Sequence, residues 1–298
     1  MRSVDQPIII ADSISPEGIR LTTFQLRYWR PIHSELMTHR AFSRNAGSSR
    51  ARPSKAIIEQ VANDPWGPLH WGKNEPGMQA NAELDGWELT NSQGAWKQSA
   101  KFAAEMAHHM VQNNAHKQIV NRLLEPFTYI DVVVTATDFA NWYALRDHED
   151  AQPEIRRLAE LMKRAHLESI PKLLQPGSWH LPYITEQDWA DATYRSINMI
   201  GALSLLKKAS AARCARVSYK LFNGDTANFG ADLELFDRLL VSQPLHASPA
   251  EHQATPDVYK KHNWRTGESP HWVNKKLHGN FRGWCQHRKM LPNEYVPG

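Results

Sequence analysis

The feature that most constrains the fold is an alternation of apolar and polar side chains near the N-terminus. In the segment TTFQLRYWR, Phe24, Leu26 and Tyr28 fall on one side of an extended chain, with polar residues on the other side. A period of two is typical of a strand with one buried face, so we expect residues 7–30 to be extended. A second short apolar run, YIDVVVTATD, follows at 129–138.

The rest of the chain is largely helical in pattern. Apolar residues recur three or four positions apart over 96–124, and again from Pro153 onward, which predicts two amphipathic helices. Thr185 and Asp188 have the spacing of a capping box, which predicts a third helix that ends near Lys208. The segment ADLELFDRLLVSQ predicts a fourth. The apolar faces of the first two helices would comprise Phe102, Met106, Met110, Ile119 and Leu123, and Ile155, Leu158, Met162 and Ala165.

Residues 64–95 contain Pro, Gly, Asn and Trp without a period, and we predict an irregular excursion there. With more helix than strand, the chain is expected to be α+β. At 298 residues, with no linker or low-complexity segment, we expect a single domain spanning 1–298.

Composition limits the compartment and the class of protein. Two cysteines, Cys214 and Cys285, exclude a disulfide framework and favour a reducing cytoplasm. No apolar run approaches the roughly 20 residues of a membrane span. The first residues, MRSVDQPIII, lack the pattern of a signal peptide. The net charge of +4 is mild and does not by itself require a polyanionic partner. We therefore expect a soluble cytoplasmic protein without a membrane partner.

One short stretch is unusually rich in cations. Residues 38–53, THRAFSRNAGSSRARP, hold one histidine and four arginines among small hydroxyl residues, and no acid. This composition favours an anionic partner, either nucleic acid or a small phosphorylated ligand. The chain has neither a GxGxxG segment nor a GK[ST] phosphate loop. Side chains must therefore hold the anion, and guanidinium groups bind phosphate through two parallel hydrogen bonds.

The same stretch carries a family resemblance. HRAFSRNAGSSR is similar to the Arg-His-Arg signature of the flavin-dependent thymidylate synthases. The positions that match are His39, Arg40, Asn45, Ser48 and Arg50. Two positions depart from the pattern: Thr38 stands where the first Arg is usual, and Ala46 stands where the family has Glu.

Two later segments resemble the same family in the same order. NRLLEPF is similar to an Arg-x-x-Leu-Pro segment through Arg122. TATDFANWYALRDHEDAQPEIRRLA resembles a helix pair of the family through Asn141, Arg146 and the Ala-Gln-x-Glu-Ile run at 151–155. Each segment alone is modest evidence for the family, whereas three segments in the same order over more than a hundred residues are strong evidence.

The remaining resemblance is out of order. Residues 215–252 resemble the N-terminal segment of the family, with a His-x-Ser/Thr-Pro-x-Glu-His motif at 246–252. Here that segment lies within 211–298, near the C-terminus. It is followed by QHRKMLPNE, a second His-Arg copy that keeps the pair Asn293 and Glu294 which the first copy lacks. We infer a circularly permuted or partly duplicated relative, and we expect the two incomplete copies to supply one site jointly.

The resemblance implies methylation of dUMP at C5 to give dTMP, with FAD as cofactor and NADPH and methylenetetrahydrofolate as co-substrates. It also implies helices packed on a small mixed or antiparallel sheet, assembled as a homotetramer. Arg146 would bind the nucleotide and act catalytically by stabilising charge that develops in the pyrimidine ring. The other substrate-binding candidates are Ser48, Arg50 and Arg122. The cofactor-binding candidates are His39, Arg40, Asn45, Asn141, His246, Ser248, His287, Arg288 and Glu294. No metal site is expected.

Several of these residues also have a plainer interpretation. Arg122 and Arg146 fall near helix C-termini, where a cation complements the helix dipole. Ser48 fits a turn or a cap. The 246–252 motif sets two histidines beside an acid, but its spacing matches no standard zinc pattern. Cys214 is expected to be a small buried apolar residue and not a nucleophile.

Two other functions stay open at this level. The departures at Thr38 and Ala46 are compatible with hydroxymethylation of dUMP or dCMP on the same scaffold. A protein of a different class would bind nucleic acid, with the basic stretch on phosphates and tryptophans on bases. The resemblance favours the enzyme, and no stable nucleic-acid partner is expected.

Overall fold

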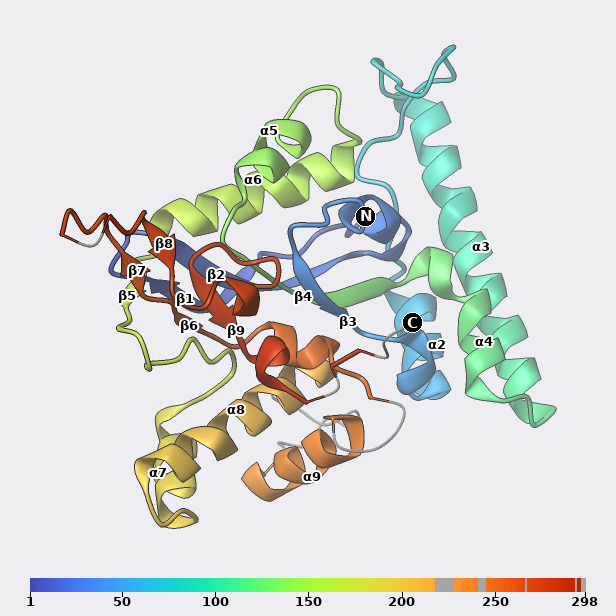
Figure 1. The fold of residues 1–298 in the computed structure, drawn as a ribbon. Coiled ribbons are helices and arrows are strands. Elements are labelled where there is room, and N and C mark those ends of the chain that lie inside the picture. Colours follow the sequence, from blue (N-terminus) through green and yellow to red (C-terminus); the bar gives the residue numbers. More distant parts are fainter. Residues whose placement is uncertain (218–227, 241–244, 266, 293, 296–298) are drawn as a thin grey trace.

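The computed structural model describes residues 1–217, 228–240, 245–265, 267–292 and 294–295. A five-stranded sheet in the order β3-β4-β2-β1-β5 forms its centre (Figure 1). Neighbouring strands are antiparallel except β1 and β5, which are parallel, so the sheet is mixed. The strands are β1 (Ile8–Ile14), β2 (Arg20–Trp29), β3 (Ser43–Ala46), β4 (Tyr129–Ala136) and β5 (Lys172–Leu173), and two small sheets pair β6 (Ala254–Pro256) with β9 (Trp284–Gln286) and β7 (Tyr259–Lys260) with β8 (His271–Trp272).

Helices cover both faces of the sheet (Figure 1). On one face lie α5 (Ala140–Arg146) and α6 (Pro153–Glu168); on the other lie α7 (Glu186–Tyr194), α8 (Met199–Arg216) and α9 (Phe229–Leu240). A separate group at one side comprises α2 (Ser54–Asn63), α3 (Gly86–Gln112) and α4 (Lys117–Leu123), and α1 (His33–Leu36) is a single turn. Short 3₁₀ helices are η1 (Arg30–Ile32), η2 (Ser49–Ala51), η3 (Glu125–Phe127), η4 (Ser248–Glu251), η5 (Lys275–Leu277) and η6 (His287–Met290). The predicted α+β class is confirmed.

The alternation in β2 has the predicted consequence. Phe24, Leu26 and Tyr28 are fully buried, and they pack against the apolar face of α6, which includes Leu158 and Met162. Each such side chain contributes about 1.5–3 kcal/mol when it leaves water. The predicted face of α6 and the capping box of Thr185 ahead of α7 are likewise confirmed.

Three predicted helix boundaries were wrong. Helix α3 begins at Gly86, so the irregular excursion ends at Asp85 and not at residue 95. The predicted helix over 96–124 is two helices, because the chain turns at Asn114, whose φ of 58° lies in the left-handed region. The predicted helix that ends near Lys208 is also two helices. The first, α7, ends at Tyr194, and Asn198 then caps α8.

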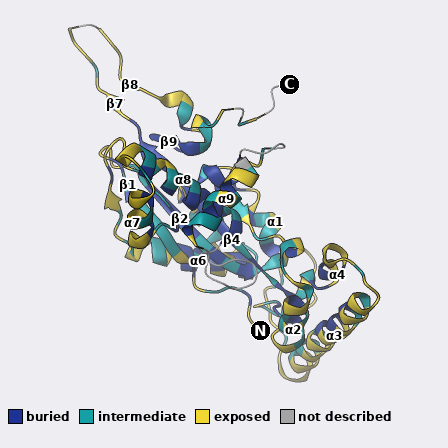
Figure 2. Ribbon diagram, turned by 90° about the horizontal axis from the view of Figure 1, so that it is seen from below, coloured by how far each residue is buried: buried dark blue, intermediate teal, exposed yellow. Residues whose placement is uncertain are grey.

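The predicted apolar face of α3 was also wrong. Phe102 is 61% exposed, and the buried positions are instead alanines, which pack against Ile57 and Val61 of α2. Small side chains let two helix backbones approach closely, so the contact face of α3 carries few large apolar residues. Figure 2 shows that most of α3 is exposed away from this face. Over the described part of the chain, no helix has both the length and the apolar character needed to cross a membrane.

Candidate functional site

A hollow of about 180 Å³ lies between the loop that follows α1 and the helix α5. Four predicted site residues line it: His39, Arg40, Asn141 and Arg146. These residues come from two segments about a hundred positions apart along the chain, and β4 brings the segments together because it pairs with β3 and leads into α5. The hollow is therefore the strongest candidate site within the described residues.

The guanidinium of Arg146 is held on three sides. Its Nε donates to Nε2 of His39 at 3.1 Å, its Nη1 donates to Oε2 of Glu35 at 3.1 Å, and its Nη2 donates to Oγ1 of Thr38 at 3.4 Å. Thr38 is the position where the family pattern has an arginine. In this chain a cation from α5 lies beside that position, with its orientation fixed and its charge partly balanced by Glu35.

His39 is a buried, neutral partner of Arg146. Its ring packs edge-on against Trp142, with ring centroids 4.7 Å apart, and stacks on Phe42 at 5.8 Å. Burial lowers the pKa of His39, and the nearby cations Arg146 and Arg44 lower it further. Because Nε2 accepts from Arg146, the proton of the neutral ring is on Nδ1.

Arg40 and Asn141 differ from Arg146 because their side chains are exposed and available to hydrogen-bond a ligand. In the part of the chain that the structure describes, no hydrogen bond of either side chain is present. Beside them, the buried indole nitrogen of Trp142 has no hydrogen-bond partner among the described residues. The hollow thus presents one fixed guanidinium, one free guanidinium and one free amide, which suit an anionic ligand. One acid also lines it, Asp138, whose carboxylate accepts from the N–H of Ala140.

The other cations of the basic stretch point elsewhere. Arg44 donates to two backbone carbonyls of the preceding turn at 2.8 and 3.0 Å. The guanidinium of Arg52 lies 4.6 Å from the ring centroid of Tyr129 and donates to its hydroxyl. Arg50 is exposed. The stretch therefore does not form one continuous cationic face.

Three predicted substrate-binding residues lie outside the hollow. Ser48 accepts a hydrogen bond from the backbone N–H of Arg50, and this caps η2, as the plainer interpretation of Ser48 predicts. Arg122 is 59% exposed and donates to Glu125 at 3.3 Å. The structure does not bring Ser48, Arg50 or Arg122 to the Arg146 hollow of the same chain.

The C-terminal segment 246–252 meets the first His-Arg segment at β3. Nε2 of His252 lies 3.2 Å from the side-chain amide of Asn45 on that strand. Ser248, in η4, places its backbone carbonyl 3.2 Å from the same amide. His246 is exposed, and its backbone N–H bonds to the carbonyl of Leu239. Asn45 and the 246–252 motif are thus brought together, although they are two hundred residues apart.

The second His-Arg copy is engaged in internal contacts. Arg288 donates to Glu251 from Nη1 and to Glu294 from Nε at 2.9 Å, and Lys289 also pairs with Glu294. His287 is buried, and its ring stacks on Phe236 with centroids 6.3 Å apart. Burial, together with Lys207, lowers the pKa of His287 to about 3. This copy does not line the Arg146 hollow, and Asn293 lies outside the described residues.

Some residues that matter here gave no signal in the sequence. Glu35 is an isolated acid just outside the basic stretch, and only the fold shows that it contacts Arg146. The Ala-Gln-x-Glu-Ile run has a structural role: Gln152 caps α6 by accepting from the N–H of Ile155, and Glu154 accepts from the N–H of Leu69. Cys214 is buried, which raises the pKa of its thiol, and this agrees with the interpretation of Cys214 as an apolar residue.

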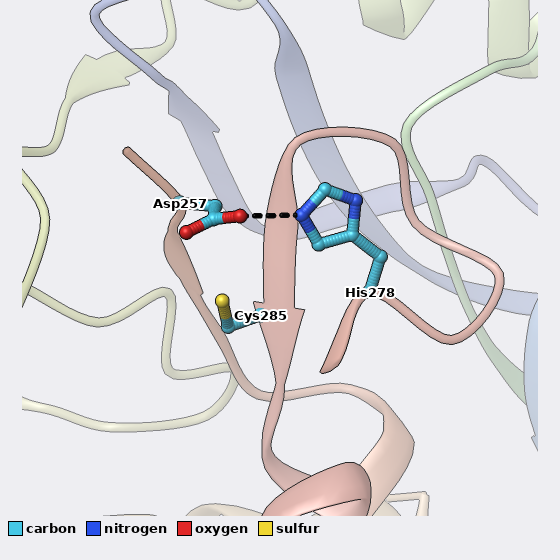
Figure 3. Close-up of side chains that lie close together, drawn as sticks. All are labelled: Asp257, His278 and Cys285. Atoms are coloured by element: carbon cyan, nitrogen blue, oxygen red, sulfur yellow. Dashed lines mark hydrogen bonds and ion pairs between the residues drawn. The ribbon is translucent and has the colours of Figure 1, made fainter. Parts of the chain in front are cut away.

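A cluster of Asp257, His278 and Cys285 resembles a metal site in its composition (Figure 3). The Asp257 carboxylate is, however, already saturated: it accepts from the backbone N–H of Val258, from two nitrogens of Asn274 and from Nε2 of His278, each at 2.8–2.9 Å. Nδ1 of His278 accepts from the N–H of Gly283. Burial raises the pKa of Cys285 to about 12, and Asp257 adds to the shift. The cluster is a buried hydrogen-bond network that joins three C-terminal loops.

Comparison with known families decides the affiliation. A family model described as "Thymidylate synthase complementing protein" matches residues 19–172. The chain belongs to this family. The match contains the Arg146 hollow and all three segments on which the resemblance was based, which confirms the predicted affiliation. The family model does not extend to residues 215–252, the segment that resembles the family's N-terminal part.

Two solved structures are similar to this family member. The UMP/dUMP methylase PolB from Streptomyces cacaoi, bound with 5-Br UMP, has 16% identity and a TM-score of 0.46, and the alignment covers 56% of this chain and 90% of PolB. The flavin-dependent thymidylate synthase ThyX from Helicobacter pylori, complexed with FAD and dUMP, has 16% identity and a TM-score of 0.33. That alignment covers 49% of this chain and 67% of ThyX. No curated protein matches the chain.

Proposed function

We propose that this chain is an enzyme that methylates dUMP at C5 to give dTMP, with methylenetetrahydrofolate as the one-carbon donor, FAD as the cofactor and NADPH as the reductant. One observation carries the proposal: in a chain of this family, His39, Arg40, Asn141 and Arg146 converge on a single hollow. The donors at the hollow are cationic or neutral, which suits a nucleotide phosphate and a polarised pyrimidine carbonyl.

Arg146 has the main role in this proposal. Its guanidinium is fixed by His39 and Thr38 before any ligand arrives, so little reorganisation is needed when charge develops in a bound ring. His39 stays neutral through burial and keeps the lone pair of Nε2 directed at Arg146. Arg40 and Asn141 supply free donors at the rim of the hollow.

The residues at the hollow fit part of FAD but not the whole molecule. Arg40 matches an anionic pyrophosphate in charge, and Asn141 adds a neutral donor beside it. A space of about 180 Å³ takes a phosphate or one ring, whereas pockets that enclose a whole ligand usually measure about 300–1,000 Å³. When bound, the reduced flavin would supply the hydride of the reaction. The binding surface for the rest of FAD is proposed to come from elsewhere.

We further propose that this surface comes from other copies of the chain in a homotetramer. Ser48, Arg50 and Arg122 carry the family pattern but lie away from the Arg146 hollow of their own chain. A site completed between copies would use both sets. The contact of His252 with Asn45 supports the proposal that 1–298 is one domain in which 211–298 stands for the family's N-terminal part. Two free, buried cysteines support a cytoplasmic location.

The test is the mass of the product. The purified protein is incubated with dUMP, methylenetetrahydrofolate, FAD and NADPH. The nucleotides are then separated and their masses are measured by mass spectrometry. A product heavier than dUMP by one CH₂ group supports the proposal. A product heavier by CH₂O, from dUMP or from dCMP in a parallel reaction, would assign hydroxymethylation instead. An unchanged nucleotide together with salt-sensitive binding of DNA or RNA would favour the nucleic-acid-binding class.

A further inference from the structure

A continuous line of hydrogen bonds crosses the sheet on the face covered by α8. At one end, Oγ of Ser13 on β1 lies 2.8 Å from Nδ1 of His180. Nε2 of the same ring lies 2.8 Å from Oγ1 of Thr23 on β2. Oγ1 of Thr23 lies 2.7 Å from Oγ1 of Thr135, its partner in the register of β2 and β4.

The line continues to Asn45, a residue of the first His-Arg segment that lies outside the Arg146 hollow. Oγ1 of Thr135 lies 2.8 Å from Nδ1 of His252, and Nε2 of His252 lies 3.2 Å from the side-chain amide of Asn45 on β3. The members before Asn45 are all buried, and Asn45 is half-buried. A buried line of this kind connects the interior of the sheet to a residue of the first motif copy.

Proton counting permits only two arrangements of this line. A hydroxyl has one proton, and a neutral imidazole has one proton on one of its two nitrogens. Burial lowers the pKa of both His180 and His252 to about 3, so both rings are neutral near pH 7. Among the described residues, neither threonine hydroxyl has an acceptor outside the line, so each ring and each threonine donates once along it. All the donors then run in the same direction, either toward Asn45 or away from it.

The surroundings of Asn45 decide the direction. One terminal atom of its amide lies 3.2 Å from the carbonyl oxygen of Ser248, 3.1 Å from that of Arg44 and 3.2 Å from Nε2 of His252. Carbonyl oxygens only accept, so this atom is the amide nitrogen. His252 therefore accepts at Nε2 and has its proton on Nδ1, which donates to Thr135.

The remaining protons follow from that assignment. Thr135 donates to Thr23, Thr23 donates to Nε2 of His180, and Nδ1–H of His180 donates to Ser13. The amide oxygen of Asn45 then faces away from the line, and it has no hydrogen bond within the described ranges. In this direction each proton along the line has an acceptor except that of the Ser13 hydroxyl, for which the described residues show none. The amide oxygen of Asn45 is the acceptor left over, and it lies at the half-buried end.

We propose that Ser13, His180, Thr23, Thr135 and His252 act as positioning residues that hold Asn45 with its carbonyl oxygen outward, so that this position accepts a hydrogen bond from an N–H group of a ligand. An imide N–H is a suitable donor, and it occurs both in a uracil ring and in a flavin ring. The identity of the ligand rests on the proposed function, whereas the order of the protons does not.

Nitrogen-15 NMR of the imidazole rings tests the order directly. In the wild-type protein we expect His180 and His252 both to have the proton on Nδ1. In Asn45→Asp, the ionised carboxylate only accepts, so His252 must donate from Nε2. While the His252 ring stays neutral, its Nδ1 then accepts and the whole line must reverse. The tautomer of His180, four hydrogen bonds away, is then expected to change to Nε2–H. Wild-type rings with Nε2–H, or an unchanged His180 in a folded Asn45→Asp variant, would overturn the proposal.

Two controls isolate the line. Thr135→Val interrupts it, so Asn45→Asp in that background should change His252 and leave His180 unchanged. His166 is a half-buried ring outside the line, hydrogen-bonded to Thr22 and to the hydroxyl of Tyr143. Its tautomer should be the same in all variants. A change of His180 in the Thr135→Val background would show that the variants act through general distortion, against the proposal.

Binding measurements test the ligand part. Asn45→Leu removes the acceptor, and dUMP and FAD are titrated separately. About a tenfold loss of affinity for dUMP assigns the acceptor to uracil, and the same loss for FAD assigns it to the flavin, in line with a net hydrogen bond of about 1–1.5 kcal/mol. No loss for either would refute the outward acceptor. If the wild-type protein binds neither compound, the proposed function fails, while the NMR result still decides the proton order.

Discussion

Glu35 and Arg146 form the ion pair at the edge of the candidate site, with Nη1 of Arg146 donating to Oε2 of Glu35 at 3.1 Å. The Glu35 side chain is 33% exposed and that of Arg146 is 22% exposed, so the pair is accessible to a ligand. A phosphate that binds Arg146 must displace this carboxylate or share the guanidinium with it. Glu35 is thus an internal competitor for the anion.

Removing that competitor should strengthen anion binding. We predict that Glu35→Gln raises the affinity for dUMP about five- to tenfold, on the order of 1 kcal/mol, because a partly exposed charge acts in a high effective dielectric. Calorimetric titration at low salt measures the change. Glu59→Gln, which alters an exposed i,i+4 pair with Lys55, is the matched control and should leave the affinity unchanged. Weaker binding by Glu35→Gln would contradict the account.

A site shared between copies should show complementation. Arg50→Ala and Arg146→Ala are each expected to lose activity, because both cations are proposed to hold the nucleotide. Mixing the two inactive proteins under conditions that exchange subunits should restore part of the activity, since some sites then combine an intact Arg50 with an intact Arg146 from different copies. Activity that stays absent in mixed oligomers, verified by size and mass, would argue against shared sites.

The buried histidines predict acid sensitivity. His180 and His252 have their pKa lowered to about 3 by burial, whereas histidine in the unfolded chain titrates near about 6.5. Below about pH 6.5 the unfolded chain binds protons that the folded chain does not. Stability is therefore full above that pH and falls toward pH 3, by up to about 1.4 kcal/mol per pH unit for each ring.

Urea unfolding between pH 6 and 5 measures this slope, in a range where carboxylates contribute little. His252→Gln should reduce the slope by about one proton, whatever its effect on stability at neutral pH. An equal slope in the variant and the wild-type protein would mean that His252 is not held neutral in the folded chain.

The Asp257 cluster should not depend on a metal. Because the carboxylate of Asp257 already accepts four hydrogen bonds, a chelator is predicted to leave the melting temperature unchanged. Asp257→Asn, by contrast, should destabilise the protein by about 1–3 kcal/mol through the donors it leaves unpaired. A fall in melting temperature with chelator, or zinc bound at one ion per chain, would show that the cluster is a metal site and contradict the prediction.

Much of the fold was predictable because the polarity of each side chain indicates whether that position is buried or exposed. In β2 each alternate residue identifies the buried face, and in α6 Ile155, Leu158 and Met162 do the same. The start of α3 was not predictable, since the stretch from Gly86 has no apolar period and Trp87 is exposed. Its helix is stabilised farther along, where alanines pack on α2.

The site divides in the same way. Motif residues such as His39 and Arg146 were found through the family resemblance, and the fold brings them together. Glu35 was missed because one acid outside a motif has no pattern. The line from Ser13 to Asn45 was missed because it depends on which strands are neighbours in the sheet, and on His180, which belongs to no motif.

The central claim is that Arg146 holds a pyrimidine nucleotide beside a flavin, and a difference absorption spectrum tests it most directly. The wild-type protein, incubated with FAD and freed of excess, should be yellow, and added dUMP should shift the flavin bands to a saturable end point. Arg146→Ala should stay folded and yellow but show no shift at the same dUMP concentration. A colourless wild-type protein, or an equal shift in Arg146→Ala, would contradict the claim.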